Sequence, residues 1–126
     1  MSALSITARG RTLHFFFDTK AWAQVEQEFG SLETMYDMID GNENPLDHTL
    51  RMTALIANAG ARQRKEPEDV TPEWLLENLT PKKIRKAGTL AKLAIMAGWK
   101  REEVDDEDEG PVDVVLEEQQ KKTEND

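Results

Sequence analysis

The most restrictive feature of this chain is the unequal distribution of its charged residues. Residues 1–100 contain 13 basic and 13 acidic residues and are neutral, whereas residues 101–126 contain 3 basic and 12 acidic residues. The last fifth therefore carries the whole net charge of −9. A block of like charge favours a solvated segment over a packed one. This division predicts one folded domain over residues 1–100, followed by an acidic, disordered tail over residues 101–126.

The composition of the body limits the classes of protein to which the chain can belong. About 100 residues can bury roughly two-thirds of their unfolded surface, which is enough for one modest core. The absence of cysteine excludes disulfides and thiolate metal sites. No apolar run approaches the length of a membrane span, and the N-terminus shows no secretory signal. The acidic net charge argues against direct binding to nucleic acid, because the tail would repel phosphates.

Local patterns at the start of the body predict a β-hairpin and two short helices. Residues 4–8 and 11–17 are β-prone runs on either side of Arg9-Gly10, which is typical of a hairpin. A helix is expected to follow Asp18 or Thr19 and to end at Phe29-Gly30. A second helix is expected from the Ser31 cap to Gly41, with its apolar residues on one face.

Three later helices are indicated by a cap residue followed by proline at the first helical position. These pairs are Asn44-Pro45, Thr71-Pro72 and Thr80-Pro81, and the helices are expected over residues 45–62, 72–79 and 81–97. The first is apolar around most of its circumference, which predicts a central position. The last is expected to close at Gly98. The predicted fold class is α+β, mainly α: an N-terminal β-hairpin packed on a small bundle of about five helices.

The sequence contains no recognisable arrangement of catalytic or metal-binding residues. His14 and His48 fall in different predicted elements, and neither has a partner at metal-ligand spacing. Residues 105–110 begin like an EF-hand calcium loop, but Leu116 occupies position 12, where a bidentate glutamate is needed. We interpret this stretch as a solvated acidic run. The prediction is a protein without catalytic residues, cofactor or metal.

Two groups of residues on the last predicted helix are candidates for binding a partner. Its N-terminal basic cluster stands where the helix dipole disfavours cations, and forms either a solvated face or a docking surface for the acidic tail or an acidic partner. Two apolar residues further along point away from the inner stripe, and Trp99 follows them. These residues are either buried on all sides or contact another chain. The candidate partner-binding residues are Leu93, Met96, Trp99, Lys82, Arg85 and Lys86.

Two stretches near the N-terminus carry a resemblance to a known family. Residues 5–15 read Ser-Ile-Thr-Ala-Arg-Gly-Arg-Thr-Leu-His-Phe, and residues 22–35 read Trp-Ala-Gln-Val-Glu-Gln-Glu-Phe-Gly-Ser-Leu-Glu-Thr-Met. This opening resembles that of the tail assembly chaperones of long-tailed bacteriophages and prophages, and the resemblance extends over residues 4–100. It implies a non-enzymatic protein that binds the tape measure protein before tail tube subunits polymerise around it. It also implies a place in the cytoplasm of the bacterial host and absence from the mature virion.

The resemblance implies further partners and a second product. The tail tube protein is a second expected partner, and a homo-oligomer is compatible with the sequence. Many members of the family are made in two lengths by ribosomal slippage, and the codons of Lys121-Lys122 are a candidate slippery site that the nucleotide sequence would test. Two alternatives stay open: another small virion or adaptor protein, and an anionic regulatory protein that binds a basic partner. The latter predicts salt-sensitive binding that depends on residues 102–126.

Overall fold

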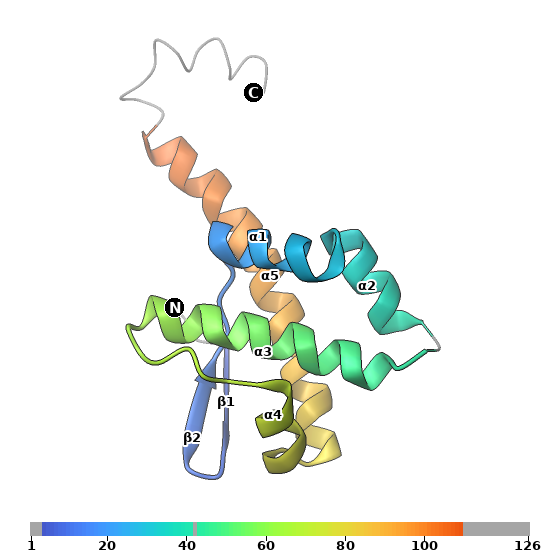
Figure 1. Ribbon diagram of the computed structural model, residues 1–126. Helices are drawn as coiled ribbons and strands as arrows, with labels where there is room; N and C mark the ends of the chain where they lie inside the picture. The colour runs from blue at the N-terminus through green and yellow to red at the C-terminus, as the bar shows by residue number, and fades with distance from the viewer. Residues whose placement is uncertain (1–3, 42, 110–126) are drawn as a thin grey trace.

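The computed structural model describes residues 4–41 and 43–109. Within these residues, a two-stranded hairpin packs against five helices (Figure 1), which confirms the predicted α+β, mainly α fold. The elements are β1 (Ser5–Ala8), β2 (Arg11–His14), α1 (Thr19–Phe29), α2 (Leu32–Asp40), α3 (Pro45–Gln63), α4 (Pro72–Asn78) and α5 (Pro81–Glu109).

The hairpin forms at the predicted turn. Its strands pair antiparallel, and the turn residues Arg9 and Gly10 have φ angles of 52° and 77°. Left-handed backbone at both central residues matches the right-handed twist of the strands, and glycine adopts it without steric cost. Ile6 and Leu13 lie opposite each other in the register and are both buried. An isolated hairpin is marginally stable in water, and this one is held by contacts of β2 with α3 and of β1 with α5.

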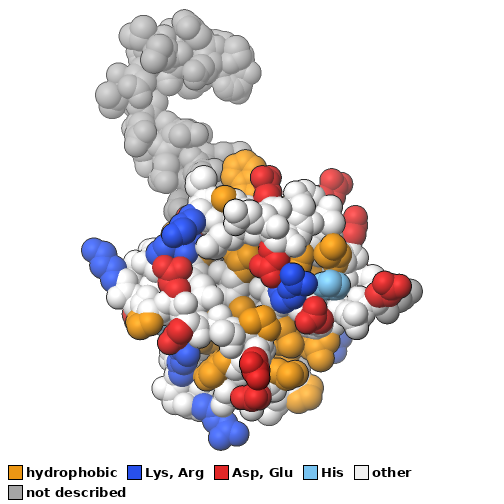
Figure 2. Space-filling model, in the orientation of Figure 1, with side chains coloured by type: hydrophobic (Ala, Val, Ile, Leu, Met, Phe, Trp, Pro, Cys, Tyr) orange, Lys and Arg blue, Asp and Glu red, His pale blue; other side chains and the backbone are white. Residues whose placement is uncertain are grey.

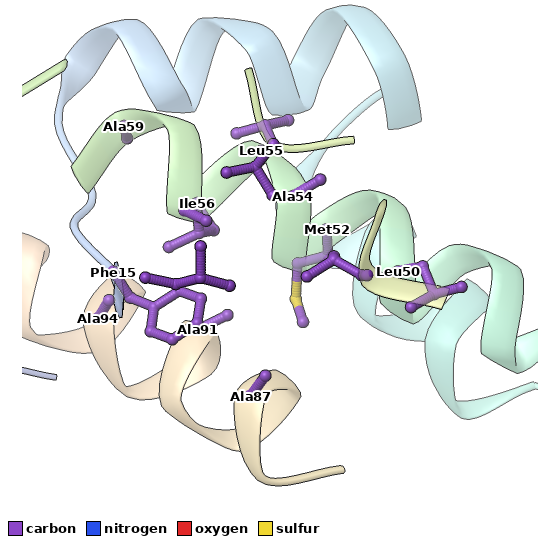
Figure 3. Packing of buried hydrophobic residues seen from close by; sticks show 14 of the residues in the cluster. Phe15, Leu50, Met52, Ala54, Leu55, Ile56, Ala59, Ala87, Ala91 and Ala94 are labelled. Atoms are coloured by element: carbon purple, nitrogen blue, oxygen red, sulfur yellow. The ribbon is translucent and has the colours of Figure 1, made fainter. Parts of the chain in front are cut away.

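Helix α3 lies at the centre of the fold, as its apolar circumference predicts. It contacts α1, α2, α4, α5 and β2. Met52 and Ile56 are completely buried, and Leu50 and Leu55 are nearly so. In the core, the ring of Phe15 lies between α3 and the alanine side chains of α5 (Figure 3). Ala87, Ala91 and Ala94 form this alanine stripe, and small side chains allow two helices and an aromatic ring to share the space.

The helix caps follow the sequence prediction at most positions. The side chains of Asp18, Ser31 and Thr71 each accept a hydrogen bond from the backbone N–H three residues later, at 2.9–3.0 Å. Asn44 is the exception, because it adopts left-handed backbone (φ 52°) and its side chain makes no capping hydrogen bond. The start of α3 is instead favoured by Pro45 at its first turn.

The predicted end of the last helix at Gly98 is wrong. Helix α5 continues through Gly98 and Trp99 to Glu109. A β-carbon at Gly98 would lie 2.7 Å from the carbonyl oxygen of Phe17, which is closer than van der Waals contact allows. The sequence pattern of a glycine after an apolar helix is typical of a C-cap. Here the glycine allows the segment before α1 to pack closely on α5.

Helix α5 includes the first part of the predicted acidic tail. Its first nine residues, 101–109, continue the backbone of α5. The remaining residues, 110–126, lie outside the described part of the chain, and so does the Lys121-Lys122 pair.

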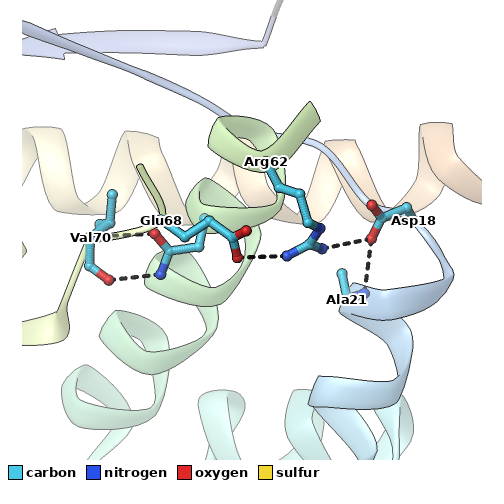
Figure 4. Close-up of polar contacts among 6 residues, drawn as sticks. Asp18, Ala21, Arg62, Glu68 and Val70 are labelled. Carbon is cyan, nitrogen blue, oxygen red and sulfur yellow. Dashed lines mark hydrogen bonds and ion pairs between the residues drawn. The ribbon is translucent and has the colours of Figure 1, made fainter. Parts of the chain in front are cut away.

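A polar network joins the start of α1, the end of α3 and the loop that follows it (Figure 4). The Arg62 guanidinium donates to the Asp18 carboxylate at 3.0 Å and to the Glu68 carboxylate at 2.8 Å. The side-chain amide of Asn58 in α3 exchanges two hydrogen bonds with the backbone of Val70 in the loop, at 2.8 and 2.9 Å. These bonds hold the charged loop on α3 and fix the direction in which α4 begins.

Candidate functional site

The basic half of the candidate surface lies on the first turns of α5. Lys82, Arg85 and Lys86 are all exposed and point away from the core. Within the described residues, none of the ion pairs includes any of the three. The neighbouring Lys83 is used differently, because its ammonium donates to the carbonyl oxygen of Thr7 in β1 at 2.7 Å. The three cations are therefore available to an anionic partner. They lie at the N-terminal end of α5, where the helix dipole disfavours positive charge.

The apolar half lies two to three turns further along α5. Leu93 is 43% exposed and Met96 is 54% exposed. The sequence favoured burial on all sides over contact with another chain for these residues. This preference is wrong for Leu93 and Met96, because both lie on the surface. With a rise of 1.5 Å per residue, Met96 lies about 21 Å along α5 from Lys82. We call the five residues Lys82, Arg85, Lys86, Leu93 and Met96 the outer face of α5.

Trp99 is separate from the outer face. Its ring lies 5.0 Å from that of Trp22 in an edge-to-face arrangement and 6.0 Å from that of Phe17. These three rings attach α1 and the segment before it to the middle of α5. Trp99 and Trp22 are nevertheless 37% and 36% exposed. In the space-filling view, hydrophobic side chains are visible at the top, where the body meets the grey atoms (Figure 2). Trp99 therefore supports the fold and also widens the apolar surface near Met96.

A double-mutant cycle measures the structural part of the Trp99 role. We expect Trp22→Ala and Trp99→Ala to be coupled by about 1 kcal/mol in the free energy of unfolding, because edge-to-face rings attract each other beyond their buried area. Chemical denaturation of the two single variants and the double variant gives this value. Trp74 in α4 serves as the control partner, and its coupling to Trp99 should be near zero. A coupling near zero for Trp22 as well would contradict the ring contact.

The structure also contains an apolar groove that was not predicted from the sequence. It has a volume of about 650 Å³ and lies between the end of α2, the start of α3, α4 and the start of α5. Leu46 and Leu76 are 50% and 54% exposed. Hydrophobic side chains gather on the lower half of the face seen in Figure 2, over α3 and α4. The groove is lined by Ile39, Asp40, Pro45, Leu46, Thr49, Leu76, Leu79, Pro81, Ile84 and Arg85.

The six large hydrophobic residues that are exposed in the described part of the chain therefore form two groups. Leu93, Met96, Trp99 and Trp22 belong to the middle of α5 and to α1, and Leu46 and Leu76 belong to the groove. Arg85 belongs both to the outer face of α5 and to the wall of the groove. One sequence signal pointed to the groove: α4 is short, and it contains more apolar residues than a single buried face can hold.

The two histidines, Tyr36 and Lys92 lie outside the two candidate surfaces. His14 lies in β2 and His48 in α3. Among the described residues, no group of three His, Cys, Asp or Glu side chains lies close enough to hold a metal ion. Burial raises the pKa of the Tyr36 phenol, and the Lys92 ammonium lies 5.9 Å from the centre of its ring. Lys92 therefore belongs to the packing of α2 on α5 and not to the basic cluster.

None of the helices in residues 4–41 and 43–109 combines the length and apolarity that a membrane span requires. Comparison of the chain with protein-family models, curated proteins and solved structures finds no match in any of the three.

Proposed function

We propose that this protein is a non-enzymatic phage tail assembly chaperone that binds the tape measure protein during tail morphogenesis. The resemblance of residues 5–15 and 22–35 to this family motivates the assignment. One observation in the structure supports a binding role above all: Leu93 and Met96 are exposed on the side of α5 opposite its buried alanine stripe. Exposed apolar groups at fixed positions on a rigid helix are typical of a surface that another protein covers.

The outer face of α5 suits an amphipathic helical client. Leu93 and Met96 are separated by three residues and lie on one side of α5, where they can contact the apolar stripe of a second helix. The cations at Lys82, Arg85 and Lys86 would pair with acidic residues that flank such a stripe. Methionine adapts its shape to different partners, which suits a chaperone surface.

Co-expression with the tape measure protein encoded in the same genome, followed by affinity capture, tests the proposal. We expect the wild-type chain to retain the client. Leu93→Asp and Met96→Asp should each weaken retention about tenfold or more, because each places a charge in an apolar contact. The helical circular dichroism of both variants should match the wild type, because both side chains are exposed.

Leu76→Asp is the matched control for this experiment. It makes the same chemical change at a residue of similar exposure that lies on α4 and not among the apolar residues of the outer face of α5. Retention that is unchanged by Leu93→Asp and Met96→Asp would contradict binding at the outer face. Failure of the wild-type chain to retain the tape measure protein would contradict the chaperone assignment itself.

A further inference from the structure

The apolar groove has the properties of a docking site for an extended or helical segment. Its walls come from four helices, so its shape is set by the fold and not by a single mobile loop. Leu46 and Leu76 expose half of their side chains into it, and Ile39, Leu79 and Ile84 complete its apolar lining. Its wall carries one anion, Asp40, and one cation, Arg85. An occupant should therefore be apolar in its centre and acidic only at the edge that faces Arg85.

The chain itself contains one segment with this chemistry outside the described residues. Residues 112–116 read Val-Asp-Val-Val-Leu, and Glu117-Glu118 follow directly. Alternate residues of an extended chain share one side, which would group Val112, Val114 and Leu116. The acidic residues around them complement Arg85 and the adjacent Lys82 and Lys86, which have no ion-pair partner among the described residues. An anionic segment there would also offset the unfavourable position of three cations near a helix N-terminus.

The length of α5 prevents this segment from reaching the groove of its own chain. Arg85 is the last residue of α5 in the lining of the groove, and it precedes Glu109 by 24 residues. At 1.5 Å per residue this is about 36 Å of helix. The seven residues from Glu109 to Leu116 span about 24 Å when fully extended. Leu116 therefore ends about 12 Å short of Arg85 in the same chain. This limit does not apply to the groove of a second molecule, which can approach the segment freely.

We propose that residues 112–116 of one copy of this protein dock in the apolar groove of a second copy. The tail thus acts as a connector between copies, and the basic start of α5 recognises its acidic flanks. Exchange between two copies in both directions closes a dimer, whereas exchange in one direction extends to larger assemblies. The inference shares the cations Lys82, Arg85 and Lys86 with the outer face of α5 but not its apolar residues Leu93 and Met96. It does not depend on a client, because it is measured with the purified chain alone.

Sedimentation velocity of the full-length chain over a wide range of concentration tests the proposal. We expect the wild type to self-associate. Leu76→Asp in the groove and Leu116→Asp in the tail should each weaken self-association about tenfold or more, because each buries a charge in the apolar contact. Leu93→Asp is the matched control, because it makes the same change at an exposed leucine outside the groove, and it should associate like the wild type. Leu46→Asp provides a second groove variant if Leu76→Asp loses helical circular dichroism.

Mixing the two defective variants gives a sharper test. Leu76→Asp has an intact tail and Leu116→Asp has an intact groove, so the mixture should form a complex that neither variant forms alone. A fluorescent peptide of residues 110–126 should likewise bind full-length Leu116→Asp and lose about tenfold or more in affinity for the Leu76→Asp/Leu116→Asp double variant. Added salt should weaken both complexes, because part of the attraction comes from exposed charges.

Three results would overturn the proposal. The first is a wild-type chain that stays monomeric at every concentration. If in that case the peptide binds Leu116→Asp and not the wild type, the segment docks within its own chain. The second is self-association that Leu76→Asp and Leu46→Asp leave unchanged, which would exclude the groove. The third is a mixture of Leu76→Asp and Leu116→Asp that forms no complex.

Discussion

Gly60→Ala is expected to destabilise this protein by about 3 kcal/mol or more, which corresponds to a fall in melting temperature of about 15 °C. A β-carbon at position 60 would lie 1.8 Å from the carbonyl oxygen of His14. The atom it meets belongs to the backbone of the hairpin, so no side-chain rotation relieves the clash, and α3 must separate from β2. The intrinsic helix preference of alanine over glycine, about 1 kcal/mol, acts in the opposite direction and is too small to compensate.

The other glycines of the helices provide a graded control for Gly60→Ala. Gly98→Ala places a β-carbon 2.7 Å from the Phe17 carbonyl oxygen, and a smaller loss of about 1–3 kcal/mol is expected. Gly88→Ala meets the side-chain methyl of Thr49 at 3.1 Å, which can shift, so its effect should stay within about 1 kcal/mol. Thermal denaturation of the three variants gives the order. Equal stability of Gly60→Ala and Gly88→Ala would contradict the close approach of α3 to the hairpin.

Leu75→Ala is expected to cost about 3 kcal/mol, whereas Leu76→Ala should change stability by less than about 0.5 kcal/mol. Leu75 is completely buried and Leu76 is 54% exposed, although the two residues are adjacent in α4. A helix of seven residues has no stability of its own in water, so α4 depends on the side chain that anchors it to the body. Truncating Leu75 removes that anchor and leaves a cavity.

Urea denaturation of both α4 variants measures this difference, and self-association measured on the same samples separates stability from binding. Leu76→Ala should keep the stability of the wild type and lose part of its self-association, because the groove loses an apolar contact. Leu75→Ala should lower the free energy of unfolding, whether or not self-association changes. Similar free energies of unfolding for the two variants would show that α4 is not anchored by Leu75.

Much of the fold could be predicted from local signals, because these signals act within a few residues. The Arg9-Gly10 turn, the Asp18 and Ser31 caps and the Thr71-Pro72 start of α4 are all formed as expected. Each depends on a backbone preference or on a hydrogen bond to a nearby N–H, and tertiary contacts do not need to be known.

The errors occurred where one residue type serves two purposes. Gly98 has the position of a helix C-cap in the sequence, yet it permits a close contact between α5 and Phe17. Asn44 precedes a proline like the other caps, yet its side chain makes no capping bond. In both cases the local pattern is the same for either use, and the decision depends on a neighbour that is distant in sequence or on the path of the preceding chain.

The candidate surfaces divide in the same way. Periodicity places three cations on an outer face of the helix: Lys82, Arg85 and Lys86. For Leu93 and Met96, periodicity does not determine whether the side chain is buried or exposed. The groove could not be predicted, because its walls come from four helices and the periodicity of one helix does not show what packs beside it.

The sequence by itself determined the division into a neutral body and an acidic end, the hairpin, and the central position of α3. These properties follow from charge, backbone preference and the spacing of apolar residues, all of which depend only on the local sequence. The tertiary structure alone decided that α5 passes Gly98, that Trp99 packs on Trp22, and that Leu75 is core while Leu76 lines a groove. The physical reason is that a side chain is buried only when another surface packs against it, and that second surface comes from a part of the chain distant in sequence.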